Sequence, residues 1–172
     1  MKSLLGRSDL PRGLRNNNPG NLIITANAWQ GKIPVDQNTD GHFEQFRELR
    51  WGIRAMLKDI IHDIRGGRNT LTSLINEYAP PHENDTAGYI AFVSNLTGLL
   101  PDSAIVINRP VLTGLVLAKM KMENGTGPVN ANVTAQDISD AFDVLGETIP
   151  GEIPGFSDLK KKADSSSLPL AS

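Results

Sequence analysis

A change of hydrophobic period near Trp51 is the feature that most constrains the fold of this chain. From that point on, apolar residues recur at helical spacing: Ile53, Met56, Leu57, Ile60, Ile61 and Ile64. A series of this kind predicts an amphipathic α-helix that buries one face. The pair Gly66-Gly67 then predicts its end, because glycine readily takes the backbone conformation that terminates helices.

Three more helices are predicted downstream, each bounded by residues that favour a start or a stop. Thr70 is placed to cap a helix carrying Leu71 to Tyr78, which ends before proline at position 80. The next starts near Asp85 or Thr86 and stops at Gly98. A further helix runs from about Pro110 to Met122, where Asn124-Gly125 ends it.

The segment before Trp51 is dense in turn formers and predicts loops with short strands. Leu22 to Thr25 is a β-branched run, and His42 to Phe46 can return as its partner. We expect a small antiparallel hairpin or a three-stranded sheet here. The fold class predicted for the chain is therefore α+β, mainly α, with a small N-terminal β-element.

Composition changes after Gly125 and suggests three parts in the chain of 172 residues. We predict an N-terminal arm over residues 1–10, a domain over residues 11–124, and an extended tail rich in Pro and Gly over residues 125–172. The tail holds one short amphipathic helix, from Ala135 to Leu145, with Thr134 and Asp137 placed to cap it. Its apolar face is too small to fold alone, so the tail either packs back on the domain or docks on a partner.

Composition also argues against several classes of protein. The net charge of −2 does not indicate a nucleic-acid partner. The chain has no cysteine, and His42, His62 and His82 are too widely spaced to predict a metal site, so neither a metal nor another cofactor is expected. Its start lacks the apolar stretch of a signal peptide, and no apolar run reaches the ~20 residues that span a bilayer.

One N-terminal run is far from a generic loop: Pro11-Arg12-Gly13-Leu14-Arg15-Asn16-Asn17-Asn18-Pro19-Gly20-Asn21-Leu22. It is followed in order by Trp29-Gln30-Gly31, Phe43-Glu44-Gln45-Phe46, Trp51-Gly52-Ile53-Arg54-Ala55 and the stretch from Tyr78 to Thr86. Together these pieces resemble a family of phage and prophage proteins described as virion structural proteins. They are similar to the lytic structural protein of cystoviruses. The resemblance spans roughly Pro11 to Gly98.

A second likeness is to lytic transglycosylases and related glucosaminidases of the cell wall. These enzymes resemble the chain in an Asn–Gly-type turn, a Trp-Gly pair, and an aromatic strand leading into a helix. Many also have a Glu-Thr pair before a helical Tyr-Val, which Glu83, Thr86 and Tyr89 echo. The resemblance implies a lysozyme-like fold with a glycan-binding cleft. It implies a protein made in the host cytoplasm, carried in the virion and acting in the host periplasm on peptidoglycan.

Cleavage of a glycosidic bond needs a carboxylic acid that protonates the leaving oxygen. In the related wall enzymes that glutamate precedes the β-element, whereas the first glutamate here is Glu44. Glu44, between two phenylalanines, is the first candidate for the acid. Glu83 is the second, and Asp40 or Asp36 can supply a second carboxylate. The alternatives are a solvated Glu44, a Glu83 that caps a helix, and an ordinary turn at Asp40-Gly41.

Substrate contacts are predicted from amides and aromatic rings. Asn17, Asn18 and Asn21 can bind the acetamido and hydroxyl groups of sugars, or else brace their own loop. Trp29 and Tyr89 can stack on sugar faces, or else belong to the core.

Two functions follow from these candidates. The first is a virion-associated peptidoglycan-degrading enzyme, a muramidase or lytic transglycosylase, with cleavage of peptide cross-links as a variant. The second is a non-catalytic structural protein of the phage particle that binds glycan or fills a place in the particle. Under both, the tail docks on other virion proteins.

Overall fold

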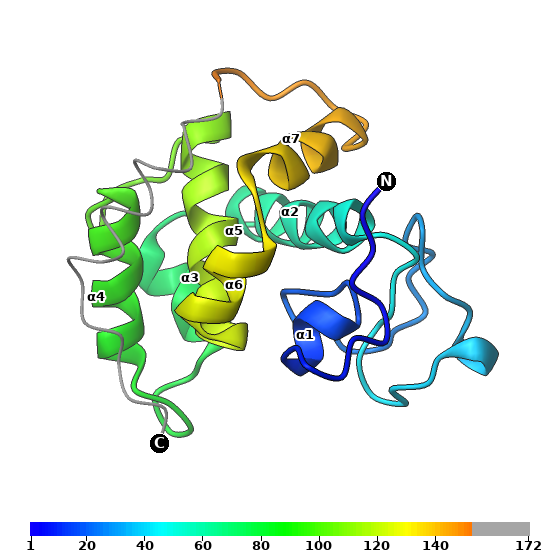
Figure 1. The fold of residues 1–172 in the computed structure, drawn as a ribbon. Helices are drawn as coiled ribbons and strands as arrows, with labels where there is room; N and C mark the ends of the chain where they lie inside the picture. The colour runs from blue at the N-terminus through cyan, green and yellow to red at the C-terminus, as the bar shows by residue number, and fades with distance from the viewer. Residues whose placement is uncertain (153–172) are drawn as a thin grey trace. The chain divides into compact units, whose positions relative to one another are not determined.

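The computed structural model describes residues 1–152, and the regular structure of these residues is helical (Figure 1). This confirms the mainly α part of the predicted fold class. The elements in chain order are α1 (Arg12–Arg15), the 3₁₀ turn η1 (Val35–Gln37), α2 (Leu49–Arg65), α3 (Leu71–Tyr78), α4 (Thr86–Thr97), α5 (Arg109–Asn124), α6 (Thr126–Asn132) and α7 (Ala135–Asp143).

The chain divides into two compact units, each made of two separate stretches of sequence. Unit 1 combines Met1–Lys58 with Lys119–Thr148, and unit 2 comprises Asp59–Ala118 with residues 149–152. Helices α2 and α5 each run from one unit into the other. The first ten residues belong to unit 1, where Leu4 and Leu10 are buried and the Leu49 N–H donates to the Lys2 carbonyl.

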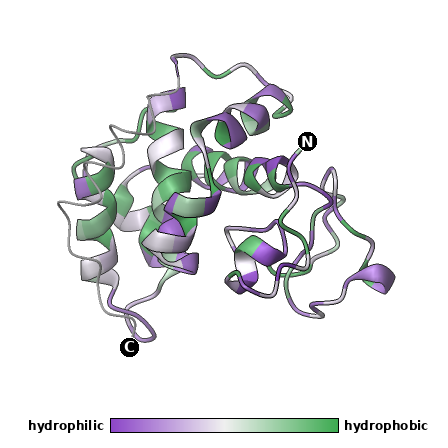
Figure 2. Ribbon diagram, viewed as in Figure 1, coloured by the Kyte–Doolittle hydropathy of each residue, from purple (hydrophilic) through white to green (hydrophobic). Residues whose placement is uncertain are grey.

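Each unit has its own apolar core. In unit 1 the buried side chains include Leu14, Phe46, Leu49, Ile53, Met56, Leu57, Val129, Ile138 and Phe142. In unit 2 they include Ile60, Ile61, Leu71, Leu74, Phe92, Leu96, Leu112, Leu115 and Val116. Figure 2 shows hydrophobic and hydrophilic residues alternating along α2, as a helix with one buried face requires. No helix within residues 1–152 is both long and apolar enough to cross a membrane.

Several helix ends lie where capping residues predict them. The Thr70 side chain accepts from the Ser73 N–H and completes a capping box at the start of α3. Gly98 ends α4 in the left-handed conformation, with φ of 75°. Thr134 and Asp137 form the predicted capping box at the start of α7. These ends depend on a few neighbouring residues, which is why the sequence predicts them.

The expected hairpin or three-stranded sheet is replaced by two isolated antiparallel bridges, Ile23 with Phe43 and Lys32 with Phe46. No regular strand forms in the described part of the chain. Side chains form hydrogen bonds with backbone groups that could otherwise have paired the two segments as longer strands. Asn18 bonds the N–H and carbonyl of Leu22 and the carbonyl of Glu44. The predicted segments do meet, through backbone hydrogen bonds from the Ile24 N–H to the His42 carbonyl at 2.9 Å and from the Glu44 N–H to the Leu22 carbonyl at 2.8 Å.

Residues 125–148 of the predicted tail are compact rather than extended. They form α6, which had no sequence prediction, and α7, and both belong to unit 1. Their buried side chains are Val129, Val133, Ile138, Ala141, Phe142 and Leu145. Of the alternatives that the sequence left open for this segment, packing back on the domain is the one observed. Residues 153–172, with the rest of the predicted docking tail, lie outside the described residues.

Candidate functional site

Asn17 and Asn18 are fully buried in unit 1, and their amides bind backbone. Asn17 accepts from the Leu4 N–H at 2.7 Å and donates to the carbonyl of Phe46 at 2.9 Å. Asn18 donates to the carbonyls of Leu22 and Glu44, at 3.0 and 2.9 Å. An amide used in this way has no surface to offer a ligand. The geometry therefore favours the bracing role for both residues over sugar binding.

Asn21 lies at the edge of the same loop and is half-buried. Its side-chain N–H donates to Glu123 of α5 at 2.9 Å, while its Oδ1 is buried without a hydrogen-bond partner. Next to it, Asn124 accepts from the Leu14 N–H and donates to the Pro19 carbonyl. The end of α5 thus holds the asparagine run in place.

Glu44 is buried inside unit 1 rather than at its surface. Its Oε1 lies 2.8 Å from the Lys32 Nζ and accepts from the Thr25 N–H at 3.1 Å. Its side chain has no exposed surface, and the side chain of Lys32 is only 13% exposed. The pair ties the loop at residues 25–32 to the chain at Glu44. A carboxylate paired and enclosed in this way is poorly placed to protonate a glycan.

Asp40 forms a bidentate ion pair with Arg12. The guanidinium Nε and Nη2 donate to the two carboxylate oxygens at 2.7 and 2.8 Å. Backbone N–H groups of Phe43 and His42 and the amide of Asn16 complete the set of donors. The hydrogen bond from Arg12 above all holds the pKa of Asp40 well below its usual range. Asp40 therefore stays ionised and lacks the proton that a general acid must give.

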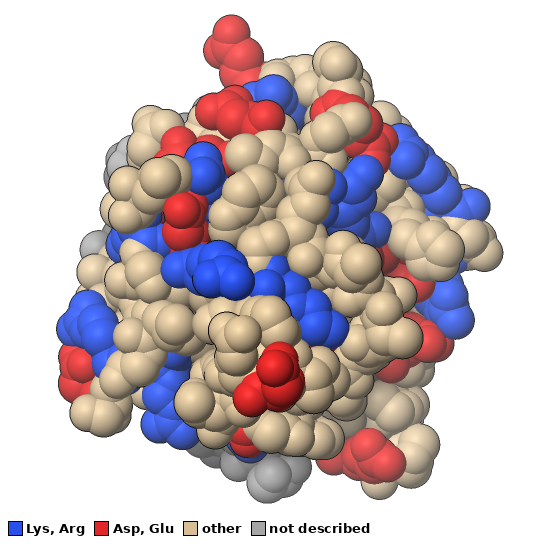
Figure 3. All heavy atoms as spheres, turned by 90° about the vertical axis from the view of Figure 1, so that its right-hand side faces the viewer, with Lys and Arg blue, Asp and Glu red and all other residues tan. Residues whose placement is uncertain are grey.

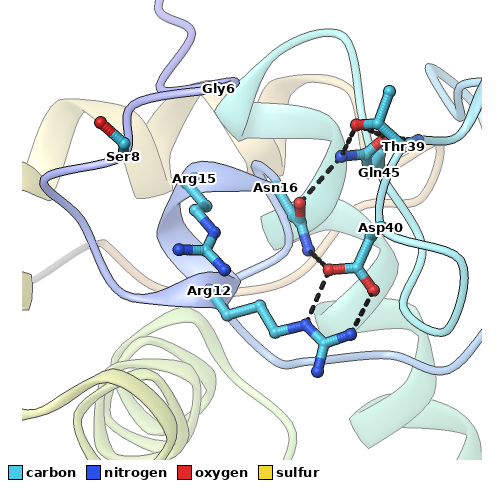
Figure 4. A pocket seen from close by; sticks show the side chains of 8 residues that line it. All are labelled: Gly6, Ser8, Arg12, Arg15, Asn16, Thr39, Asp40 and Gln45. Carbon is cyan, nitrogen blue, oxygen red and sulfur yellow. Dashed lines mark hydrogen bonds and ion pairs between the residues drawn. The ribbon is translucent and has the colours of Figure 1, made fainter.

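A polar pocket opens beside this pair in unit 1, with a volume of about 380 Å³ (Figure 4). It is lined by Gly6, Ser8, Arg12, Arg15, Asn16, Thr39, Asp40 and Gln45. Asn16 links the two sides of the wall, donating to Asp40 at 2.8 Å and accepting from Gln45 at 2.9 Å. Arg12 also stacks on the ring of Phe43, 4.5 Å from its centroid. The wall is thus built of side chains that already bind one another.

Asp40 is the one lining residue of this pocket for which the sequence predicts a role. Arg12, Arg15 and Asn16 belong to the motif that carried the resemblance, yet none of them was assigned a function. Two arginines three residues apart in a turn-rich segment were the available signal, because they project on one side of a helical turn. Gln45 gave no signal, since its role depends on its contact with Asn16.

Glu83 lies in unit 2, in the turn between α3 and α4, and its side chain is 67% exposed. Its Oε1 is 3.1 Å from the His82 Nε2. The alternative role as a helix cap falls to Asp85, which accepts from the Gly88 N–H at the start of α4. Glu83 is thus accessible and not used to cap the helix.

The two predicted aromatic residues differ in exposure. Tyr89 is buried in α4, so its ring belongs to the core of unit 2. Trp29 is half-buried in the loop of unit 1 and keeps part of its ring at the surface. Trp29 therefore remains the candidate for stacking on a sugar face.

Charges over the face drawn in Figure 3 are mixed in sign, with basic and acidic side chains interspersed. Within residues 1–152, no group of three or more His, Asp or Glu side chains is arranged to hold a metal ion.

Comparison with known proteins places the chain among proteins of bacterial viruses. No family model matches it. It is 34% identical over 125 residues to Protein P5 of Pseudoalteromonas phage PM2, a match that covers 70% of this chain and 76% of the relative. The chain belongs to the family of this phage protein.

Proposed function

We propose that the protein is a component of the phage particle that opens the peptidoglycan of the host wall. It cleaves glycan as a muramidase or lytic transglycosylase and is held in the particle by other virion proteins. Membership in a phage protein family supports the viral role. The resemblance of the Pro11 to Leu22 run to phage lytic proteins supports the wall as substrate.

The observation that carries the catalytic part is the accessibility of Glu83. Of the other candidates, Glu44 is enclosed with Lys32, and Asp40 is held ionised by Arg12. The Glu83 carboxylate is 67% exposed, within reach of a polymeric substrate. Because an insoluble glycan can react only with groups at the surface, we assign the role of general acid to Glu83.

The chemistry asked of Glu83 is proton transfer in both directions. Its carboxylic acid protonates the glycosidic oxygen as the bond to the sugar breaks, and the carboxylate so formed takes the proton of the water, or of the muramic 6-hydroxyl, that attacks the anomeric carbon. A glycan chain lying over the turn would exclude water from the carboxyl group. Prolines at positions 80 and 81 restrict the backbone just before it, and the Glu83 N–H donates to the Pro80 carbonyl at 3.0 Å.

The test is loss of turbidity of purified Gram-negative peptidoglycan, followed by mass spectrometry of the released fragments. Wild-type protein is expected to release anhydro-muramyl or reducing fragments. Glu83→Gln is expected to slow release about 100-fold or more, as for loss of a general acid. Asp143→Asn, an exposed carboxylate at the end of α7, is the matched control and should leave the rate unchanged.

Equal activity of Glu83→Gln and wild type would contradict the assignment of Glu83. Fragments cut within the stem peptide would instead identify an endopeptidase. Absence of fragments from folded wild-type protein would contradict glycan cleavage altogether.

A second function is favoured by the pocket of unit 1. Its one lining carboxylate, Asp40, is held ionised, and its wall offers hydrogen-bond donors rather than an acid. This arrangement suits binding better than cleavage, as in a non-catalytic structural protein of the particle that holds glycan. Wild-type protein that pelleted with the wall and released nothing would favour this function.

A further inference from the structure

The pocket of unit 1 contains one cation that its own wall does not neutralise. Its charged lining residues are Arg12, Arg15 and Asp40, so two positive charges face one negative charge. Arg12 and Asp40 neutralise each other through their two hydrogen bonds. No other carboxylate in the pocket lining neutralises the charge of Arg15.

Arg15 is fixed at its backbone and free at its guanidinium. Its carbonyl accepts from the Gly6 N–H at 2.9 Å, and its N–H donates to the Pro11 carbonyl at 3.0 Å. The side chain is exposed and forms no ion pair or hydrogen bond with another side chain among residues 1–152. In Figure 4 it lies in the pocket beside Arg12, and no dashed line reaches it.

The rest of the wall is arranged to keep this cation unpaired. Asp40, the one lining carboxylate, is occupied by Arg12, by Asn16 and by backbone N–H groups. Gln45 is held by Asn16 and Thr39. Ser8 also lines the pocket. The pocket therefore presents donors and one net positive charge to whatever enters it.

We propose that this pocket binds a carboxylate, with the Arg15 guanidinium as the group that receives it. A planar guanidinium matches the two oxygens of a carboxylate and binds them through parallel hydrogen bonds. One unneutralised positive charge matches a group of charge −1. The inference rests on the proposed function for the source of that group, which is the stem peptide of peptidoglycan, since its residues carry free carboxylates along the glycan.

The experiment measures binding of a soluble disaccharide muropeptide with free stem-peptide carboxylates to the full chain by isothermal titration. Arg15→Gln is expected to weaken binding about tenfold, the loss of one charge-assisted interaction. Arg15→Lys, which keeps the charge but loses the planar fork, should bind with intermediate affinity. Arg47→Gln removes an exposed arginine outside the pocket and should bind like wild type. A muropeptide with amidated carboxyl groups should bind about as weakly to wild type as the free acid binds to Arg15→Gln.

Equal affinity of wild type and Arg15→Gln, both with wild-type circular dichroism and melting temperature, would overturn the proposal. Equal binding of the amidated muropeptide would do the same. Inorganic phosphate that bound at Arg15 more tightly than the muropeptide would overturn the stem peptide as the source of the anion.

These outcomes are separate from those of the proposed catalysis. If wild-type protein releases fragments but its muropeptide binding does not depend on Arg15, the proposed catalysis is supported and the proposed carboxylate site is contradicted. If binding depends on Arg15 but no fragments are released, the carboxylate site is supported and the catalysis is contradicted.

Discussion

Buried polar side chains determine the structure of the N-terminal loops. Asn17, Asn18 and Glu44 have no exposed surface, yet each binds backbone groups far away in the sequence. Loops with few regular hydrogen bonds must satisfy their backbone in some other way, and these side chains supply it. Residues that looked like a sugar-binding and catalytic set therefore include several that hold the N-terminal loops in shape.

Glu44→Gln is predicted to report on stability rather than on catalysis. Removing the charge leaves Lys32 enclosed without its partner, at a cost of about 3 kcal/mol in the free energy of unfolding. Urea denaturation of the purified protein measures it. The double variant Glu44→Gln with Lys32→Met should lose less than the two single variants added together. Wild-type stability with a loss of lytic rate would instead restore Glu44 as the acid.

Asp40 is predicted to make stability depend on acid. Its pKa in the folded protein is lowered, chiefly by the hydrogen bond from Arg12. The stabilisation is therefore present above the unfolded pKa of about 3.9 and is lost as pH falls toward the folded value. Urea midpoints measured from pH 6 to pH 3 should fall less steeply in Asp40→Asn than in wild type. Asp9→Asn breaks a more exposed ion pair with Arg7 and should change the slope less. Parallel curves for Asp40→Asn and wild type would contradict this role.

At the scale of elements, helix α2 and the asparagine-rich loop at residues 16–21 are in direct backbone contact. Gly52 of α2 faces the carbonyl of Asn17, and a Cβ at this position would overlap that oxygen. Trp51 likewise packs against Gly31, where a Cβ would meet its side chain. The N-terminal loops thus pack against the start of α2.

Gly52→Ala is predicted to destabilise the protein by roughly 3 kcal/mol, because backbone must move to admit one methyl group. Gly127→Ala is the control, because nothing beyond its two chain neighbours and the backbone of its own helix lies within 4 Å of a Cβ at this position of α6. Only Pro128, which follows it, disfavours alanine in a helix there, so we expect a change of no more than about 1 kcal/mol. Thermal denaturation of both variants compares them. A Gly52→Ala variant as stable as wild type would show that α2 and the loop are not in close contact.

At the scale of the whole molecule, a segment late in the chain completes a unit that begins at the N-terminus. Residues 119–148 join Met1–Lys58, and Lys2 pairs with Asp137 of α7 at 2.7 Å. Arg54 of α2 donates to the Val144 carbonyl at 2.7 Å. The predicted tail therefore contains structural residues up to this point.

Truncation is predicted to have opposite effects at two positions. A chain ending at residue 124 loses the buried side chains of α6 and α7 and should fail to give a cooperative unfolding transition. A chain ending at residue 152 keeps every described core residue and should unfold like the full chain. If residues 153–172 dock on virion proteins, the chain ending at residue 152 should cleave purified wall but should not be incorporated into particles. Incorporation of this truncated chain into particles would contradict that docking role.

Local features of the chain were predictable from sequence because a few neighbouring residues determine them. Hydrophobic spacing and caps such as Thr70, Gly98 and Thr134 marked where helices begin and end. Sequence also offered several candidate carboxylates, but it could not rank them, because their rank depends on burial and ion pairing.

Tertiary structure decided what these residues do, because their environments come from partners distant in the chain. Glu44 became a buried partner of Lys32, Asp40 an ionised partner of Arg12, and Glu83 an exposed carboxylate. The pocket, with Arg15 free and Gln45 held by Asn16, required the same long-range contacts. Hydrophobic period and helix capping are determined by residues close together in the sequence, whereas burial and ion pairing depend on which distant segments come into contact.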